Sequence, residues 1–134
     1  ALIDSVDIAF TAARFQAGTP PVVNAYAAEA GIALIRETGI EAIEARIRDL
    51  TGSAMDRLTA ADFHLATPRD DARRGPQVAI RARDEVAAVQ ALAARNIVTS
   101  SRDGNVRCMF HAYNNEADID ALLAGLIAHR DLMA

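Results

Sequence analysis

The hydrophobic period of this chain changes near residue 60, and that change restricts the folds that the chain can adopt. Before it, apolar residues recur at helical spacing and predict helices over 20–37 and 40–58. After it, short alternating segments predict strands over 62–67, 77–81, 97–100 and 106–110. Asp84 and Asn115 are placed to cap two further helices. We therefore expect an α+β fold in which helices cover a small antiparallel sheet.

Turn and capping residues predict where these elements begin and end. Asp103-Gly104 predicts a tight hairpin turn between the last two strands. Thr19 is expected to cap the first helix, with Pro20 at its first helical position, where a proline loses no hydrogen bond. Gly39 is suited to end the same helix. A short extended piece is expected over residues 5–10.

The first helix is apolar around most of its circumference. Its apolar positions are Val22, Val23, Ala25, Tyr26, Ala30, Ile32, Ala33, Leu34 and Ile35. A helix of this kind needs burial on more than one side, and a chain of 134 residues is too small to supply it. The second helix instead gathers its apolar residues on one face, with charged residues elsewhere on the wheel.

Composition argues against several classes of function. The net charge of −4 at pH 7 gives no reason to expect nucleic acid, and no apolar run reaches the ~18 residues of a membrane span. Cys108 is the single cysteine, so neither an intramolecular disulfide nor a multi-cysteine metal site can form. The three histidines lack metal-ligand spacing, and we expect no metal site. With no visible signal peptide, a cytoplasmic location is the simplest expectation.

Three motifs follow one another along the chain. They are Arg14-Phe15-Gln16-Ala17-Gly18-Thr19-Pro20-Pro21, Ser101-Arg102-Asp103-Gly104-Asn105-Val106-Arg107 and Tyr113-Asn114-Asn115. In these residues the chain resembles the C-terminal part of class V aminotransferase-fold enzymes, which include cysteine desulfurases, selenocysteine lyases, kynureninases and isopenicillin N epimerase-like proteins. The resemblance runs from about Arg14 to the C-terminus. It implies a remnant of the large cofactor-binding domain in residues 1–38. Residues 39–134 would then be the C-terminal small domain of a fold-type I pyridoxal-phosphate enzyme.

The Gly18-Thr19-Pro20-Pro21 junction can bind a phosphate or simply begin a helix. A loop glycine before a helix N-terminus leaves free backbone N–H groups at the positive end of the helix dipole, and the Thr19 hydroxyl adds a donor. An ordinary capped helix has the same local sequence. The resemblance implies the first role: Thr19 contacts the cofactor phosphate of the neighbouring subunit, and Gly18 allows the close approach.

Arg107 is expected on a strand whose alternate, apolar residues face the core, so that its own side chain faces away. The guanidinium can lie free on the surface, or it can hold a carboxylate through two parallel hydrogen bonds. The resemblance implies the second role, because the arginine before the Tyr-Asn pair holds the substrate α-carboxylate in the family. Arg102, across the hairpin turn, is expected to line the same site.

Cys108 follows Arg107 and is expected to face the core as a small apolar residue. In the cysteine desulfurases the nucleophilic cysteine lies on a loop before the carboxylate-binding arginine. The corresponding stretch of this chain, Asp103 to Val106, contains no cysteine. The sequence therefore argues against desulfurase activity.

The chain contains no lysine, since all 14 of its Lys+Arg positions are arginine. The enzymes that it resembles hold pyridoxal phosphate as a Schiff base on a lysine. We therefore expect the C-terminal domain of a pyridoxal-phosphate enzyme that acts on an amino acid or related amine as a homodimer. This chain is expected to be inactive alone and to contain no catalytic residue. The alternative is a non-enzymatic dimerising or interaction module derived from the same fold.

Overall fold

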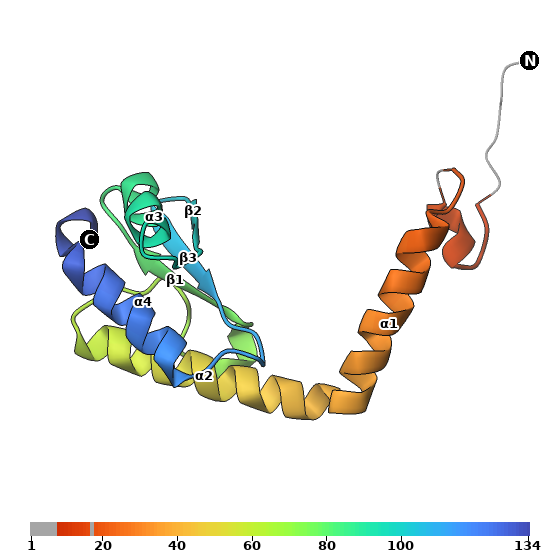
Figure 1. Cartoon of the computed structure of the whole chain (residues 1–134), viewed down its shortest axis with the longest axis horizontal. Helices are drawn as coiled ribbons and strands as arrows, with labels where there is room; N and C mark the ends of the chain where they lie inside the picture. Colours follow the sequence, from red (N-terminus) through yellow and green to blue (C-terminus); the bar gives the residue numbers. More distant parts are fainter. Residues whose placement is uncertain (1–7, 17) are drawn as a thin grey trace, which may run out of the picture. The chain divides into compact units, whose positions relative to one another are not determined.

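The computed structural model describes residues 8–16 and 18–134 (Figure 1). The chain divides into two compact units, Ala1–Thr38 and Gly39–Ala134. The first unit contains a short 3-10 helix, η1 (Ala12–Phe15), and the helix α1 (Val22–Thr38). Among the described residues, no helix combines the length and the apolar character needed to cross a membrane.

Helix α1 begins at Val22, two residues later than the sequence predicts. The carbonyl of Pro21 accepts a helical hydrogen bond from the Ala25 N–H at 3.1 Å, so the prediction that Thr19 caps this helix is wrong. A residue that precedes a proline is disfavoured in the helical conformation, and both Thr19 and Pro20 precede one. Of the extended piece expected over 5–10, residues 5–7 lie outside the described residues, and residues 8–10 form no strand.

The second unit contains an antiparallel sheet in the order β1 (Gln77–Arg81), β3 (Asn105–Met109) and β2 (Ser100–Arg102). The predicted hairpin turn joins β2 to β3. Asp103 has a φ of 52° and Gly104 a φ of 73°, as a tight two-residue turn requires. The turn pairs Arg102 with Asn105. Both strands therefore lie closer to the turn than the expected ranges, 97–100 and 106–110.

The prediction of a strand over 62–67 is wrong, because this segment makes a single antiparallel bridge, between Leu65 and Ile80. Asp62, with a φ of 64°, turns the chain directly after α2 (Ile40–Ala60). Beyond the bridge, a side chain replaces a backbone partner: the Thr67 hydroxyl accepts a hydrogen bond from a backbone N–H of β1 at 2.8 Å. The segment thus borders β1 without becoming a regular strand.

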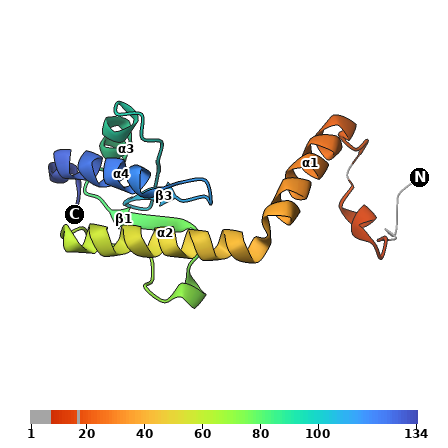
Figure 2. The same cartoon turned by 60° about the horizontal axis from the view of Figure 1, so that its bottom comes forward.

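Three helices and one face of the sheet enclose a single hydrophobic core (Figures 1 and 2). The helices are α2, α3 (Glu85–Ala93) and α4 (Glu116–Ala128). Short 3-10 turns, η2 (Asp71–Arg73) and η3 (Arg130–Leu132), precede β1 and follow α4. The sheet and the residue after β3 contribute Val78, Ile80, Val106, Cys108 and Phe110. The predicted α+β fold, with helices on a small antiparallel sheet, is confirmed.

The predicted caps of α3 and α4 are confirmed. The Asp84 side chain accepts an N–H of α3 at 2.9 Å, and the Asn115 side chain accepts an N–H of α4 at 2.8 Å. Each cap satisfies an N–H group that has no partner inside its helix. The spacing of Val86, Val89 and Leu92 in the sequence predicts that all three face inward, but Val86 is 56% exposed, so the prediction is wrong for this residue. Ala88 and Leu92, one helical turn apart, bury the inner face of α3 instead.

Candidate functional site

Arg107 lies at the middle of β3, the central strand, on the face of the sheet that points away from the core. Its neighbours along the strand, Val106 and Cys108, are buried on the opposite face, while Arg107 is half-buried. Its cross-strand partners are small: Ala79 on β1 and Ser100 on β2. The predicted alternation is confirmed, and both cross-strand partners of Arg107 have short side chains.

The side chain of Gln77 orients the Arg107 guanidinium. Its Oε1 accepts a hydrogen bond from Arg107 Nε at 2.9 Å. The bond crosses the sheet diagonally, because Gln77 is paired with Met109 in the strand register. This bond does not use Nη1 and Nη2, which carry the other N–H donors of the guanidinium. Sequence reasoning missed Gln77, although its polar side chain at an outward position of β1 was a usable signal.

Among the described residues, five other arginines of the second unit are paired with acidic side chains, whereas six others, like Arg107, are not: Arg46, Arg73, Arg81, Arg83, Arg95 and Arg130. The ion pairs are Arg48–Glu44 at 2.6 Å, Arg57–Glu116 at 3.5 Å, Arg102–Asp103 at 3.5 Å, and the closer contacts Arg57–Asp120, Arg69–Asp56 and Arg74–Asp71. Within the described part of the chain, no carboxylate pairs with Arg107. An arginine held by a neutral amide and lacking an acidic partner can bind a ligand carboxylate through charge-assisted hydrogen bonds.

Arg102 shares the outward face of the sheet with Arg107. The register places it opposite Asn105, one row nearer the hairpin turn, and Arg81 flanks Asn105 on the other side. The Arg102 side chain is 72% exposed, and its Nε lies 3.5 Å from Asp103 Oδ2. The sheet therefore brings Arg81, Arg102 and Arg107 into neighbouring rows of one face, where their charges together favour an anion.

The Tyr113-Asn114-Asn115 motif builds the loop between β3 and α4. The Asn114 side chain accepts the His111 backbone N–H at 2.8 Å and donates to Asp118 at 3.0 Å, while Arg46 donates to the Asn114 carbonyl at 3.0 Å. Hydrogen bonds from the Asn114 side chain and from the Asn115 N–H lower the pKa of the Asp118 carboxyl below its ordinary value. The loop that follows the Arg107 strand is therefore fixed to α2 and to α4.

Cys108 is a core residue, as the sequence predicts. It is 6% exposed, and its Sγ lies 3.5 Å from the Val78 carbonyl. Burial raises the pKa of the thiol to about 12, so the thiol is protonated near neutral pH. A protonated, buried thiol is a poor nucleophile.

Gly18 and Thr19 belong to the first unit, and both are exposed, while Ala17 of the same motif lies outside the described residues. A Cβ added to Gly18 would meet no atom within 4 Å, so the described part of this chain alone does not require glycine there. Thr19 does not cap α1. Its hydroxyl group and the first N–H groups of α1 are donors of the kind that a phosphate accepts.

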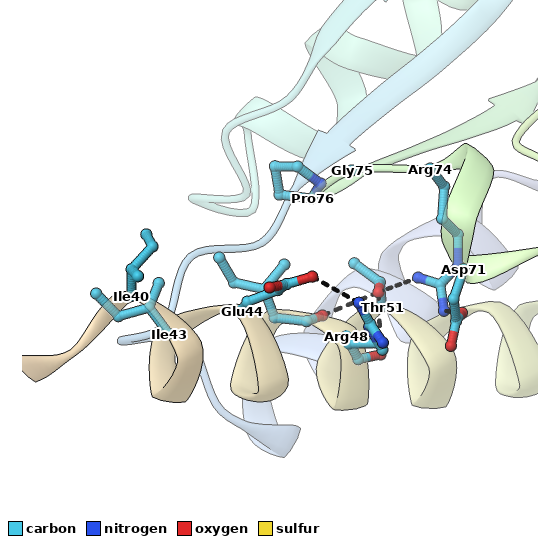
Figure 3. A pocket seen from close by; sticks show the side chains of 10 residues that line it. Ile40, Ile43, Glu44, Arg48, Thr51, Asp71, Arg74, Gly75 and Pro76 are labelled. Atoms are coloured by element: carbon cyan, nitrogen blue, oxygen red, sulfur yellow. Dashed lines mark hydrogen bonds and ion pairs between the residues drawn. The ribbon is translucent and has the colours of Figure 1, made fainter.

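A pocket of about 260 Å³ lies between the first half of α2 and the segment 71–76 (Figure 3). Its lining includes Ile40, Ile43, Ile47, Thr51, Asp71, Arg74 and Pro76. Arg74 donates hydrogen bonds to Thr51 and Asp71, so its charge is used within the second unit. In the residues that the structure describes, no cluster of His, Cys, Asp and Glu suits a metal ion.

Residues 43–126 match the family model described as the kynureninase C-terminal domain. The matched segment runs from the first turn of α2 into α4 and includes the whole sheet with Gln77 and Arg107.

Curated relatives match the chain over one part of their own length. An uncharacterised aminotransferase of Bacillus subtilis (strain 168), YcbU, is 29% identical over 110 residues, which cover 81% of this chain and 29% of that protein. The kynureninase of Myxococcus xanthus (strain DK1622) is 34% identical over 74 residues, which cover 53% of this chain and 17% of that protein. The kynureninase of Pseudomonas fluorescens is 26% identical over 98 residues, which cover 70% of this chain and 24% of that protein. The chain therefore spans less than a third of each relative.

A solved structure has the same fold. The apo cysteine desulfurase of Thermococcus onnurineus NA1 superposes with a TM-score of 0.79 and 21% sequence identity, over 95% of this chain and 37% of that chain. At this identity the likeness shows the fold and not the reaction.

Proposed function

The chain belongs to the kynureninase C-terminal domain family and has the class V aminotransferase fold, and on this premise we propose that it is the C-terminal domain of a longer pyridoxal-phosphate enzyme. The proposed substrate is an amino acid or a related amine. Relatives described as an aminotransferase and as kynureninases support this class of reaction. The fold itself does not choose among transamination, epimerisation, β-elimination and kynureninase-like hydrolysis.

Arg107 is the observation that carries the proposal. Its guanidinium lies on the open face of the sheet, is held by Gln77, and has no acidic partner among the described residues. In the proposed role, Arg107 binds the substrate carboxylate and thereby sets the position of the α-carbon. Arg102, on the same face, is proposed to line the same site and to favour the entry of an anionic group.

The residues of this chain fit one part of a pyridoxal-phosphate site. When bound, this cofactor supplies an electron sink for bonds broken at the substrate α-carbon. The chain has no lysine, so the covalent attachment must come from another part of the enzyme. Thr19 and Gly18 provide exposed donors beside a helix start. We propose that they contact the phosphate of the cofactor held by the neighbouring subunit of a homodimer.

Substitution of Arg107 in the longer enzyme tests the proposal. We expect Arg107→Ala to weaken binding of a carboxylate substrate by ~2 kcal/mol, which is about a 30-fold higher KM. Arg107→Lys keeps the charge and loses the fork geometry, so we expect it to be intermediate. The matched control is Arg48→Ala, which removes an exposed arginine paired only with Glu44. If Arg107→Ala leaves the KM unchanged, Arg107 is a surface residue that does not bind the substrate carboxylate.

The phosphate contact has a separate test. Thr19→Val preserves the shape of the side chain and removes its donor. We expect the variant enzyme to retain less pyridoxal phosphate after dialysis than the parent enzyme, with the KM for substrate less affected. Thr59→Val, an exposed threonine of α2, is the control. Equal cofactor retention in the two variants would exclude Thr19 as a phosphate contact.

The interaction-module alternative is favoured by one feature, that α1 buries none of its apolar residues. A domain that has lost catalysis could use this helix to bind a second copy of itself. The coding sequence upstream of Ala1 distinguishes the two functions. An upstream domain with a lysine would support the enzyme, and a start codon close to Ala1 would support the module.

A further inference from the structure

We propose that Gln77 is a positioning residue, which holds the Arg107 guanidinium so that a carboxylate binds at its Nη1–Nη2 edge. This inference rests on the proposed function, because it takes Arg107 as the carboxylate ligand. Gln77 makes no contact with the substrate in this proposal. It acts through Arg107 alone.

The strand register explains why Gln77 can reach Arg107. Arg107 is paired with Ala79, and Gln77 precedes Ala79 by two residues on the same outward face of β1. Diagonal neighbours of this kind lie within reach of long side chains. The methyl group of Ala79 leaves space for the guanidinium to lean toward β1, where Gln77 Oε1 meets Arg107 Nε at 2.9 Å. Both side chains are half-buried, which limits competition from water.

The position of this bond selects one edge of the guanidinium. A carboxylate can bind an arginine in a bidentate manner either at the edge formed by Nε and one Nη or at the edge formed by the two Nη groups. Because Gln77 occupies Nε–H, the first edge is closed to a ligand. The Nη1–Nη2 edge remains, and its direction is fixed by the Nε anchor.

The neutral amide of Gln77 also preserves the charge of Arg107 for the ligand. An acidic residue at position 77 would orient the guanidinium equally well, but it would compete with the substrate carboxylate for the same positive charge. The ion-paired arginines Arg57 and Arg69 show the contrasting arrangement, in which carboxylates of this chain use the charge. A glutamine therefore suits a binding arginine, and a glutamate suits a structural one.

Two substitutions in the longer enzyme separate orientation from charge. Gln77→Met keeps the length of the side chain and removes the acceptor, and we expect the KM for a carboxylate substrate to rise roughly three- to tenfold with little change in kcat. Gln77→Glu keeps the acceptor and adds a negative charge, so we expect a larger rise in KM. The matched control is Gln90→Met, an exposed glutamine of α3.

A double substitution tests whether Gln77 acts through Arg107. In an Arg107→Ala background, Gln77→Met should have no further effect on KM, because the group that it positions is gone. If Arg107→Ala raises the KM and Gln77→Met alone does not, the positioning role is overturned while the proposed function stands. If Arg107→Ala has no effect, the proposed function itself fails.

The chain itself provides a readout that does not depend on activity. In ¹⁵N-labelled protein of 134 residues, the Arg107 Nε–H proton should exchange with water more slowly than that of Arg48, whose partner is the exposed carboxylate of Glu44. Gln77→Met should abolish this protection, and Gln77→Glu should restore it. Backbone amide spectra establish that each variant is folded. Unchanged exchange in a folded Gln77→Met variant would overturn the inference.

Discussion

At the scale of single residues, the carboxylate of Asp118 holds the loop that follows the Arg107 strand. Its Oδ2 accepts a hydrogen bond from the Asn114 side chain at 3.0 Å and another from the Asn115 N–H at 2.9 Å. These bonds favour the ionised carboxyl and lower its pKa below the ordinary value. Such a group contributes stability that is fully present above the unfolded pKa and is lost as the pH falls through the folded pKa.

We therefore expect Asp118→Asn to destabilise the chain near neutral pH, and the difference from the parent chain to shrink below about pH 4. Urea unfolding near pH 7 and near pH 3 measures both differences. Asn114→Ala removes the larger cause of the shift, so it should bring the pKa of Asp118 back toward 3.8 in an NMR titration. A destabilisation of equal size at both pH values would show that the carboxylate charge has no part in the loop.

At the scale of elements, the β2–β3 hairpin positions Arg107, and its turn depends on Gly104. This residue has a φ of 73°, and a Cβ added to it would meet no atom within 4 Å. Gly104→Ala should therefore destabilise the chain through backbone strain alone, by about 1 kcal/mol. Gly75→Ala is the matched control, because its Cβ would also meet nothing and its φ is not positive. Thermal unfolding of both variants makes the comparison, and equal melting temperatures would contradict the strained turn.

The sequence predicts one apolar stripe on α4, and the structure buries a narrower face: the predicted stripe is Ile119, Leu122, Leu123, Leu126 and Ile127. Leu126 is 1% exposed in the core, whereas the adjacent Ile127 is 49% exposed. We expect Leu126→Ala to destabilise the second unit by about 2–5 kcal/mol, since it removes buried surface and leaves a cavity. Ile127→Ala should change the unfolding free energy by less than about 1 kcal/mol. If chemical denaturation shows similar losses of unfolding free energy for the two variants, α4 packs a different face against the core.

At the scale of the whole molecule, the exposed apolar surface of α1 favours association with another protein surface. The helix buries none of its residues, and Val23, Tyr26 and Leu34 are 79%, 70% and 64% exposed. We expect the isolated chain to self-associate in a concentration-dependent manner in sedimentation experiments, and Leu34→Glu to reduce the association. Val98→Glu is the control, because Val98 is 92% exposed but belongs to the second unit. A monomer at all concentrations would contradict this expectation.

The sequence alone determined the features that depend on residues close together in the chain. The hairpin turn at Asp103-Gly104, the caps at Asp84 and Asn115, and the outward position of Arg107 each follow from residues only a few positions apart. The motifs around Arg107 also indicated the family, which the family match and the shared fold confirm. The binding roles of Gly18, Thr19, Arg102 and Arg107 remain predictions.

The tertiary structure decided which distant residues meet. Gln77 and Arg107 are 30 positions apart, and Arg46 and Asn114 are 68 apart, so the local sequence does not show that the members of either pair meet. The same holds for the segment over 62–67, which became a single bridge because only Leu65 meets β1 as a regular partner. Periodicity specifies which face a side chain occupies, but the register between strands specifies its neighbours. That register arises only when the helices and the sheet close around one core.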